Sequence, residues 1–446
     1  MENVQKRLTV LREIYNSRLA IIIESMVIGF IVGLLIAAFR LALNHITEFR
    51  RLWYEALPGR SWPYLALTAA VLAASGILLG FASKLRPNIK GSGIPQIKGV
   101  LLRYVSFDWR TELPLKYAAT LLALGAGLSL GREGPSVQIG AYVGMAVLTV
   151  FRRPYSQRKR LLICASAAGL SAAFNAPLAG VLFALEELAF SRNPLHIACA
   201  LGASVTADFS VAIVFGLKPV FSFNAITALP HNIFPWIILL GLLCAILAHS
   251  YKILLYKFSD MYTALHIPAV LRPVLPLLAS LPAAIYLYDV TGGGHELIEK
   301  LAHGHYTPAI LLLLLVLKMI FTGFCFGSGT SGGIFLPMLA CGALTGVLYA
   351  KLAVWAGFLG GRAELNFLML GMCAFFVAVV KAPLTGIVLI LEMTGNMYHL
   401  ADLVLAAFSA YLCSELMASR PVYNVLLERF ARLNIEIIDV KENTDV

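Results

Sequence analysis

Long apolar runs recur along this chain and constrain its fold more than any other feature. A helix needs about 20 apolar residues to cross a hydrocarbon core of about 30 Å. Charged residues make up only 13% of the chain and its mean hydropathy is +0.81, whereas a soluble domain is about one quarter charged. The sequence therefore predicts a polytopic membrane protein, with apolar runs of membrane length near 18–40, 63–83, 232–250, 267–288, 307–326, 333–350 and 400–418, among others.

The net charge of +11 is explained by membrane topology rather than by a nucleic-acid partner. The densest basic cluster, FRRPYSQRKR at 151–160, marks a cytoplasmic loop by the positive-inside rule. Residues 1–17 are also basic, and we predict an amphipathic cytoplasmic helix there, leading into the first span. No cleavable signal peptide is expected. We therefore expect a multi-pass protein of the cell membrane with both termini in the cytoplasm and no bound nucleic acid.

An internal repeat organises the chain. FNAPLAGVLFALEE (174–187) matches VKAPLTGIVLILEM (380–393) almost position for position, and GLSLGREG (127–134) matches GFCFGSGT (323–330). Such self-similarity is the signature of a duplicated architecture. In membrane transporters the repeats are often inverted and the substrate site lies where broken helices of the two halves meet, but the residues alone leave the relative orientation open. We divide the chain into the N-terminal helix 1–17, a first repeat 18–217, a linker 218–231, a second repeat 232–425 and a short cytoplasmic tail 426–446.

Three glycine-rich stretches interrupt the apolar pattern: GSGIP (91–95), GREGP (131–135) and GGIFLP (332–337). Each places Gly and then Pro where a helix would start, so each exposes backbone N–H groups. Irregular backbone inside a membrane is tolerated only when it is buried in protein or lines a cavity, and a helix start carries about half a positive charge. Converging starts would bind an anion weakly enough for it to permeate; the alternative is ordinary small-residue packing.

These motifs, in this order, resemble those of the CLC family of chloride channels and proton-coupled chloride transporters. The resemblance extends through NAPLAGVLFALEE, KAPLTGIVLILEM and RPVYNVL (420–426) and covers roughly 65–430. It implies an all-α membrane fold of two inverted repeats, whose tilted and partly spanning helices include broken ones that meet near the bilayer midplane. It also implies a homodimer with one chloride pathway in each subunit.

The resemblance assigns the ion-binding residues. Ser92 and Tyr423 would donate their hydroxyls to a central chloride, together with the backbone N–H groups of Ile334 and Phe335. Ser92, where proline would favour nitrate, implies chloride as the anion, and its presence with Tyr423 argues against the fluoride-selective branch. The full set of expected chloride-binding positions is Gly91, Ser92, Arg132, Gly134, Ile334, Phe335, Leu336 and Tyr423.

Glu133 matches the gating glutamate of the family. Arg132 and Glu133 are the only charged residues between Tyr117 and Phe151, and an ionisable residue inside a membrane is a functional candidate by default. A carboxylate at a helix start can occupy an anion position when ionised and leave it when protonated. Its alternative role is only to complement the helix dipole.

Glu187 matches the internal proton-transfer glutamate of proton-coupled members. Its alternative is a solvated carboxylate near Arg192, and Glu186 beside it either assists or is exposed. Gln96 and Lys98 stand where bacterial relatives often have glutamates, which is expected to alter the inner proton route.

We therefore expect a chloride/proton antiporter, with a passive chloride channel on the same fold as the alternative. An enzyme is not expected, because H-E-x-x-H and paired-aspartate motifs are missing from the sequence. No cofactor or metal is expected: His295, His303 and His305 are interpreted as part of a solvated loop rather than a metal site. The remaining side chains of interest receive structural interpretations, the cysteines as small core residues and the lysines as structural or weakly electrostatic groups: Cys164, Cys199, Cys244, Cys325, Cys341, Cys373, Cys413, Lys116, Lys318 and Lys381.

Overall fold

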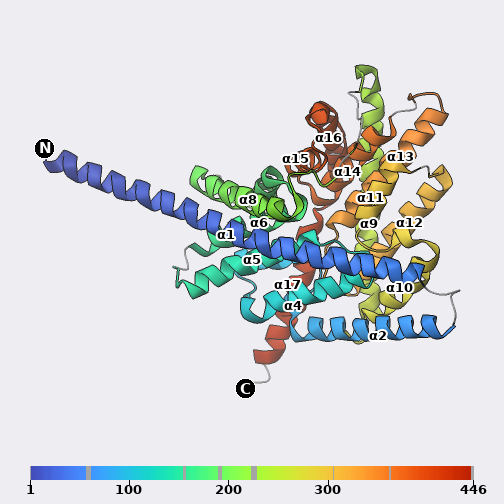
Figure 1. The fold of residues 1–446 in the computed structure, drawn as a ribbon, viewed down its shortest axis with the longest axis horizontal. Coiled ribbons are helices and arrows are strands. Elements are labelled where there is room, and N and C mark those ends of the chain that lie inside the picture. The colour runs from blue at the N-terminus through green and yellow to red at the C-terminus, as the bar shows by residue number, and fades with distance from the viewer. Residues whose placement is uncertain are drawn as a thin grey trace.

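The computed structural model describes residues 2–56, 62–153, 157–188, 193–221, 223, 229–304, 306–360 and 363–442. Within these ranges the chain is helical, and backbone pairing of the strand type is limited to two isolated bridges. Figure 1 shows the helices crossing one another at many angles, with α1 running across the view and α2 along its lower edge. The all-α fold predicted from the sequence is confirmed.

The first half of the chain contains eight α-helices. Their bounds are α1 Glu2–Glu55, α2 Trp62–Leu85, α3 Ile94–Leu101, α4 Trp109–Gly125, α5 Glu133–Val150, α6 Arg158–Phe174, α7 Pro177–Glu186 and α8 Pro194–Phe215.

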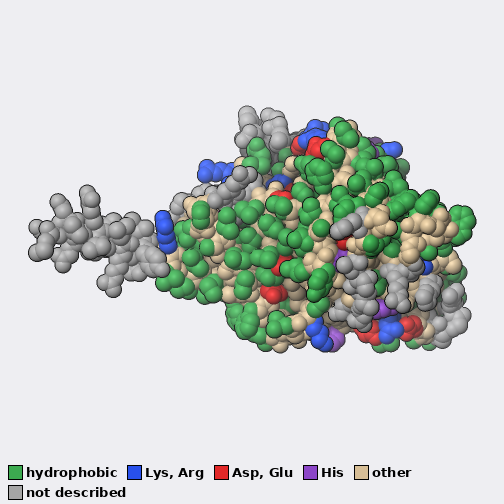
Figure 2. Space-filling view, turned by 90° about the horizontal axis from the view of Figure 1, so that it is seen from above, with side chains coloured by type: hydrophobic (Ala, Val, Ile, Leu, Met, Phe, Trp, Pro, Cys, Tyr) green, Lys and Arg blue, Asp and Glu red, His purple; other side chains and the backbone are tan. Residues whose placement is uncertain are grey.

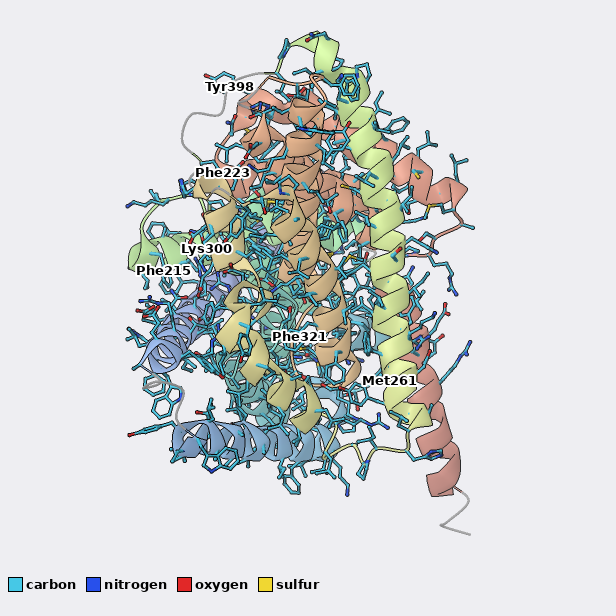
Figure 3. All side chains as sticks on the ribbon, turned by 90° about the vertical axis from the view of Figure 1, so that its right-hand side faces the viewer. Phe215, Phe223, Met261, Lys300, Phe321 and Tyr398 are labelled. Carbon is cyan, nitrogen blue, oxygen red and sulfur yellow. The ribbon has the colours of Figure 1, made fainter. Side chains whose placement is uncertain are left out.

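The second half contains nine α-helices. Their bounds are α9 Phe234–Ala264, α10 Val274–Tyr286, α11 His295–His303, α12 Pro308–Gly327, α13 Phe335–Trp355, α14 Glu364–Val380, α15 Pro383–Thr394, α16 Leu400–Leu416 and α17 Val422–Glu442. Figure 3 shows α9, with Met261 toward its lower end, running beside the helices of this half, and it packs against α12, α14 and α16.

The helices have the lengths and surfaces of a multi-pass membrane protein. Among the described residues, seven helices are long and apolar enough to cross a membrane, and four further apolar helices are shorter. The apolar run at 267–288 was expected to form a helix of membrane length. Instead it contains the shorter helix α10, which has 13 residues. Figure 2 shows hydrophobic side chains covering most of one face, with few charged groups among them.

Equivalent turns in the two halves prepare equivalent helices. Asn175 ends α6 and Lys381 ends α14, both in the left-handed backbone conformation, with φ of 52° and 65°. Each turn is followed by a helix that begins with proline, α7 at Pro177 and α15 at Pro383, where a fixed φ suits the first turn. Arg40 donates to the Asn175 side chain at 2.5 Å and steadies the first of these turns.

The two proline-initiated helices lie antiparallel and cap each other. Glu186, at the end of α7, accepts the backbone N–H groups of Leu384 and Thr385 at 3.1 and 2.7 Å. Glu392, near the end of α15, accepts those of Leu178 and Ala179 at 3.0 and 2.8 Å. Equivalent helices that run in opposite directions are related by a two-fold axis across them, so the repeats are inverted. This settles the orientation that the residues alone left open.

Candidate functional site

The three glycine-rich breaks converge at one place. Gly91 donates its backbone N–H to Thr330 at 3.1 Å and accepts that of Gly332 at 3.0 Å. Gly131 and Gly333 exchange both backbone hydrogen bonds at 2.7 Å. Each pair joins a break of the first repeat to the break of the second. Backbone pairing therefore holds the starts of α3, α5 and α13 together.

This convergence requires glycine at the closest contact. A Cβ on Gly134 would lie 2.7 Å from the carbonyl oxygen of Ser92, a distance at which the backbone would have to shift. Gly93, the residue before α3, has a φ of +90°, which side-chain-bearing residues adopt only with strain. The glycines thus allow two helix starts to approach within van der Waals contact.

Two hydroxyl groups lie buried close to these helix starts. Ser92 is 1% exposed and Tyr423 is 0% exposed, and neither hydroxyl oxygen has a hydrogen-bond partner among the described residues. Lys252 holds the approach to α17, where Tyr423 lies, by donating to the carbonyl of Arg420 at 3.1 Å. A buried polar group without a partner costs about 1–3 kcal/mol. Such a pair fits a ligand that accepts hydrogen bonds, as an anion does.

The start of α13 supplies backbone donors beside them. Ile334 and Phe335 are fully buried, and the first N–H groups of a helix have no acceptor within it. The Phe335 ring packs between Phe174 and Phe376, at 5.0 and 4.8 Å between ring centroids. Tyr251 donates its hydroxyl to the carbonyl of Ile334 at 3.4 Å. These contacts fix the direction of the helix start.

Glu133, the first residue of α5, places its carboxylate between two helix starts. It is 0% exposed, and in the part of the chain that the structure describes neither of its oxygens has a hydrogen-bond partner. Glu133 Oε2 and the backbone nitrogen of Leu336 lie on either side of Gly131: a Cβ placed on that glycine would be 2.4 Å from the first atom and 3.1 Å from the second. The carboxylate oxygen is therefore near the start of α13. Arg132 Nε is 3.9 Å from Oε1. The carboxylate thus occupies a position that would suit a mobile anion.

The histidine-containing stretch differs from the predicted solvated loop. His295 begins the helix α11 and its ring stacks on Phe221 at 4.8 Å. Together with Arg50, Arg132 and Leu336 it lines a cavity of about 120 Å³ outside Glu133. The described residues contain no group of three metal-ligating side chains; His305 lies outside them.

Glu187 lies at the end of α7 and is 5% exposed. Lys98 of α3 forms an ion pair with its Oε1 at 2.5 Å and also donates to the side chain of Asn424 at 2.6 Å. Tyr423 lies close enough to interact electrostatically with both Glu187 and Glu133. The two predicted proton-carrying glutamates therefore both lie within electrostatic range of the same buried tyrosine. Arg192, the neighbour predicted from the sequence, lies outside the described residues.

Two other residues named in the sequence analysis make specific contacts. Glu186 is not simply exposed, because its carboxylate caps α15. Gln96 donates its side-chain amide to the carbonyl of Lys90 at 2.9 Å. The sequence contains one signal for the reciprocal capping of α7 and α15. A glutamate stands at the same position of the repeated apolar motif in both halves, Glu186 and Glu392.

The buried lysines stabilise turns. Lys116 donates to the carbonyls of Ile89 and Gly91 at 2.9 and 2.8 Å, and Lys318 donates to that of Gly292 at 2.8 Å. Both are fully buried. Lys381 pairs with Glu415 at 2.8 Å. These contacts agree with the structural roles predicted for the three lysines.

Comparison with known proteins adds independent findings. Residues 72–415 match the family model described as voltage gated chloride channel. The chain is 35% identical over 425 residues to the H(+)/Cl(-) exchange transporter ClcA of Citrobacter koseri, covering 92% of this chain and 89% of that protein. It is 34% identical over 442 residues to the protein of the same name from Yersinia pseudotuberculosis, covering 95% and 91%.

A solved structure shares the fold. A slow cyanobacterial Cl-/H+ antiporter superposes with a TM-score of 0.85 at 27% sequence identity, covering 92% of this chain and 98% of that one. The arrangement of helices described above is therefore that of known membrane transporters.

Proposed function

Because this chain belongs to the family of voltage gated chloride channels, we propose that it moves chloride across a membrane in exchange for protons. The relatives named as H(+)/Cl(-) exchange transporters cover nearly the whole chain. The cyanobacterial structure that shares the fold is that of an antiporter. The activity is therefore secondary transport, and enzymatic catalysis is not part of the proposal.

The position of the Glu133 carboxylate is the observation that carries the proposal. It lies at the start of α5 and near the backbone nitrogen of Leu336 at the start of α13. When ionised, the carboxylate competes with chloride for these positive helix ends. When protonated it loses its charge, and chloride takes its place. Binding of one proton to Glu133 therefore allows one chloride ion to occupy the position that the carboxylate leaves.

The central chloride site consists of two hydroxyls and two backbone donors. Ser92 and Tyr423 direct hydroxyls to the ion, and the N–H groups of Ile334 and Phe335 add the charge of the α13 start. Four such donors would offset part of the cost of dehydrating the ion, a cost that one helix dipole alone does not meet. The unpartnered hydroxyls support this assignment.

Backbone groups complete the chloride pathway on either side. The outer site lies among Arg132, Gly134, Phe335 and Leu336, where the starts of α5 and α13 meet. Gly91 and Ser92 border the inner entrance. Arg132 contributes its backbone, and its buried Nε, which has no hydrogen-bond partner among the described residues, adds positive potential at the outer site.

Protons follow a separate route on the inner side. Glu187 receives them from the cytoplasm, Glu133 exchanges them with the outer solution, and both carboxylates interact electrostatically with the buried Tyr423. A passive channel would not need a buried carboxylate at the position of Glu187. Anions and protons therefore share Glu133 but enter from the inside by different paths.

The proposed assembly is a homodimer in the cell membrane, with both termini in the cytoplasm. Apolar side chains are exposed along α8 and α16, including Phe209, Ile213, Phe408 and Leu416 at 59, 63, 62 and 80%. A lipid bilayer or a second copy of the chain would cover them. The basic residues Arg152 and Arg153 between α5 and α6 mark the cytoplasmic side.

Vesicles reconstituted with the purified protein and loaded with chloride provide the test. They are diluted into a low-chloride solution of equal pH, with a potassium ionophore to balance charge, and the external pH is recorded. Chloride efflux should drive proton uptake, so that the external solution becomes alkaline. If chloride leaves but no proton moves, the protein is a passive chloride channel and the exchange proposal is wrong.

A further inference from the structure

A lysine side chain links the inner proton site to the helix that carries the central tyrosine. Lys98 Nζ lies 2.5 Å from Glu187 Oε1 and 2.6 Å from the side-chain oxygen of Asn424. The three residues come from α3, the end of α7 and α17. Asn424 directly follows Tyr423, and α3 begins two residues after Ser92. The lysine therefore joins the helices that present the two central hydroxyls.

The surroundings of Glu187 make Lys98 its main electrostatic partner. The groups that face the carboxylate are Lys98 from α3, Tyr423 from α17 and the adjacent Glu186. Glu186 is itself held on the N–H groups of α15, and Tyr423 is a neutral hydroxyl donor. Lys98 is thus the cation that compensates the charge of Glu187 among these neighbours.

Burial makes this ion pair consequential for proton uptake. The Glu187 side chain is 5% exposed and that of Lys98 is 15% exposed. A nearby opposite charge favours the ionised form of a carboxyl group, and a buried charge that loses its partner is strongly disfavoured. Protonation of Glu187 therefore removes the ionic attraction in this contact and weakens the hold of the carboxyl group on the ammonium group.

Asn424 provides a second acceptor for the displaced ammonium. Its side-chain oxygen already accepts a hydrogen bond from Lys98, so the lysine keeps one partner after Glu187 becomes neutral. The charge on Lys98 remains throughout, and the only bond formed is between the incoming proton and a carboxylate oxygen of Glu187. When the proton leaves toward Tyr423, the ion pair forms again.

We propose that Lys98 is a positioning residue for proton entry: its ammonium group holds Glu187 as a carboxylate against α17, and each proton arriving from the cytoplasm displaces it. This inference rests on the proposed role of Glu187 in exchange. It adds a step that sets how proton uptake depends on cytoplasmic pH, and it assigns Asn424 as the acceptor that retains the displaced lysine.

Lys98→Met tests the proposal in reconstituted vesicles of the full chain. Proton uptake driven by a fixed chloride gradient is measured over a range of pH values, with the pH equal on both faces so that protein orientation is immaterial. Without the lysine, Glu187 binds a proton at lower proton concentration. The midpoint of the pH profile should therefore move upward, by about one to three units for the loss of an adjacent opposite charge.

Three further variants separate this role from a structural one. Lys98→Arg retains the cation and should keep the midpoint within about half a unit of the wild type, below the shift expected when the charge is lost. Lys84→Met removes an exposed lysine at the end of α2 and should leave it unchanged. In a Glu187→Gln background, adding Lys98→Met should leave the chloride flux unchanged, because the side chain at position 187 is already neutral.

The outcomes distinguish the two proposals. If the wild type couples protons but Lys98→Met has an unaltered profile, the assignment of Lys98 is wrong and the exchange function stands. The assignment is also wrong if Lys98→Met changes chloride flux equally with and without Glu187→Gln. If the wild type moves no protons, both proposals fail together. Should Lys98→Met not fold, Asn424→Leu, which removes the second acceptor, must slow proton uptake while Lys98→Arg does not.

Discussion

Replacing Tyr423 with phenylalanine removes one hydroxyl from the proposed central chloride site and leaves the ring in place. The hydroxyl is buried and has no hydrogen-bond partner in the described ranges, so its loss breaks no hydrogen bond seen there. A hydrogen bond to a charged group contributes about 1.5–3 kcal/mol, and about 1.4 kcal/mol is a factor of ten in affinity. Chloride binding should therefore weaken by about 10- to 150-fold.

The same substitution should have the opposite effect on the protein without chloride. An unpartnered buried hydroxyl costs about 1–3 kcal/mol, and phenylalanine removes that cost. A ligand at a hundred times its Kd stabilises the folded state by about 2.7 kcal/mol, and a tenfold weaker Kd reduces this to about 1.4 kcal/mol. Tyr423→Phe should thus raise the melting temperature in chloride-free buffer and reduce the further rise on adding chloride.

Calorimetric titration with chloride and thermal unfolding in detergent measure the two effects. Tyr262→Phe is the matched control, because Tyr262 is fully buried but donates its hydroxyl to the carbonyl of Phe324 at 3.2 Å. That variant should lose stability with and without chloride and bind chloride normally. A Tyr423→Phe protein with wild-type chloride affinity would show that this hydroxyl does not contact the ion, and the central site would have to be reassigned.

Three other substitutions test the remaining parts of the site. Glu133→Gln imitates the protonated gate and should leave a chloride flux that neither drives protons nor depends on external pH; a retained pH dependence in the flux assay would argue against the gate. Glu187→Gln should stop proton movement but spare chloride flux in the same vesicles, and persistent coupling would show that protons enter elsewhere. Glu392→Gln weakens the cap on α7 and should lower stability by about 1 kcal/mol, seen in thermal unfolding; an unchanged midpoint would mean that the cap is dispensable.

The helix starts that form the proposed anion site were predictable from local sequence. Gly followed by Pro after an interrupted apolar run identifies a helix start whatever surrounds it, because only φ preferences and missing N–H partners are involved. Arg132 and Glu133 could be identified as functional candidates because charged residues are rare in a membrane segment. Tyr423 was different: nothing within RPVYNVL itself indicates a ligand, and its role came from resemblance.

The contacts around Glu187 were not predictable in the same way. Lys98 could be noted as a departure from relatives, but its pairing with Glu187 depends on how α3, α7 and α17 pack. Glu186 and Glu187 are adjacent and chemically identical, yet one caps α15 and the other faces the lysine. The sequence predicts a solvated loop for the histidine stretch. Its packing on Phe221 is not predictable from local sequence, because it joins residues that are far apart in the chain.

The sequence alone determined that this chain spans a membrane, that it is duplicated and that it contains three buried helix starts. Each of these properties follows from composition or from spacing along the chain. Tertiary structure decided that the repeats are inverted, that Gly131 pairs with Gly333, and that Glu133 lies between two helix starts. Those properties depend on the directions in which distant helices approach one another, and the energy that sets them comes from packing across the whole molecule.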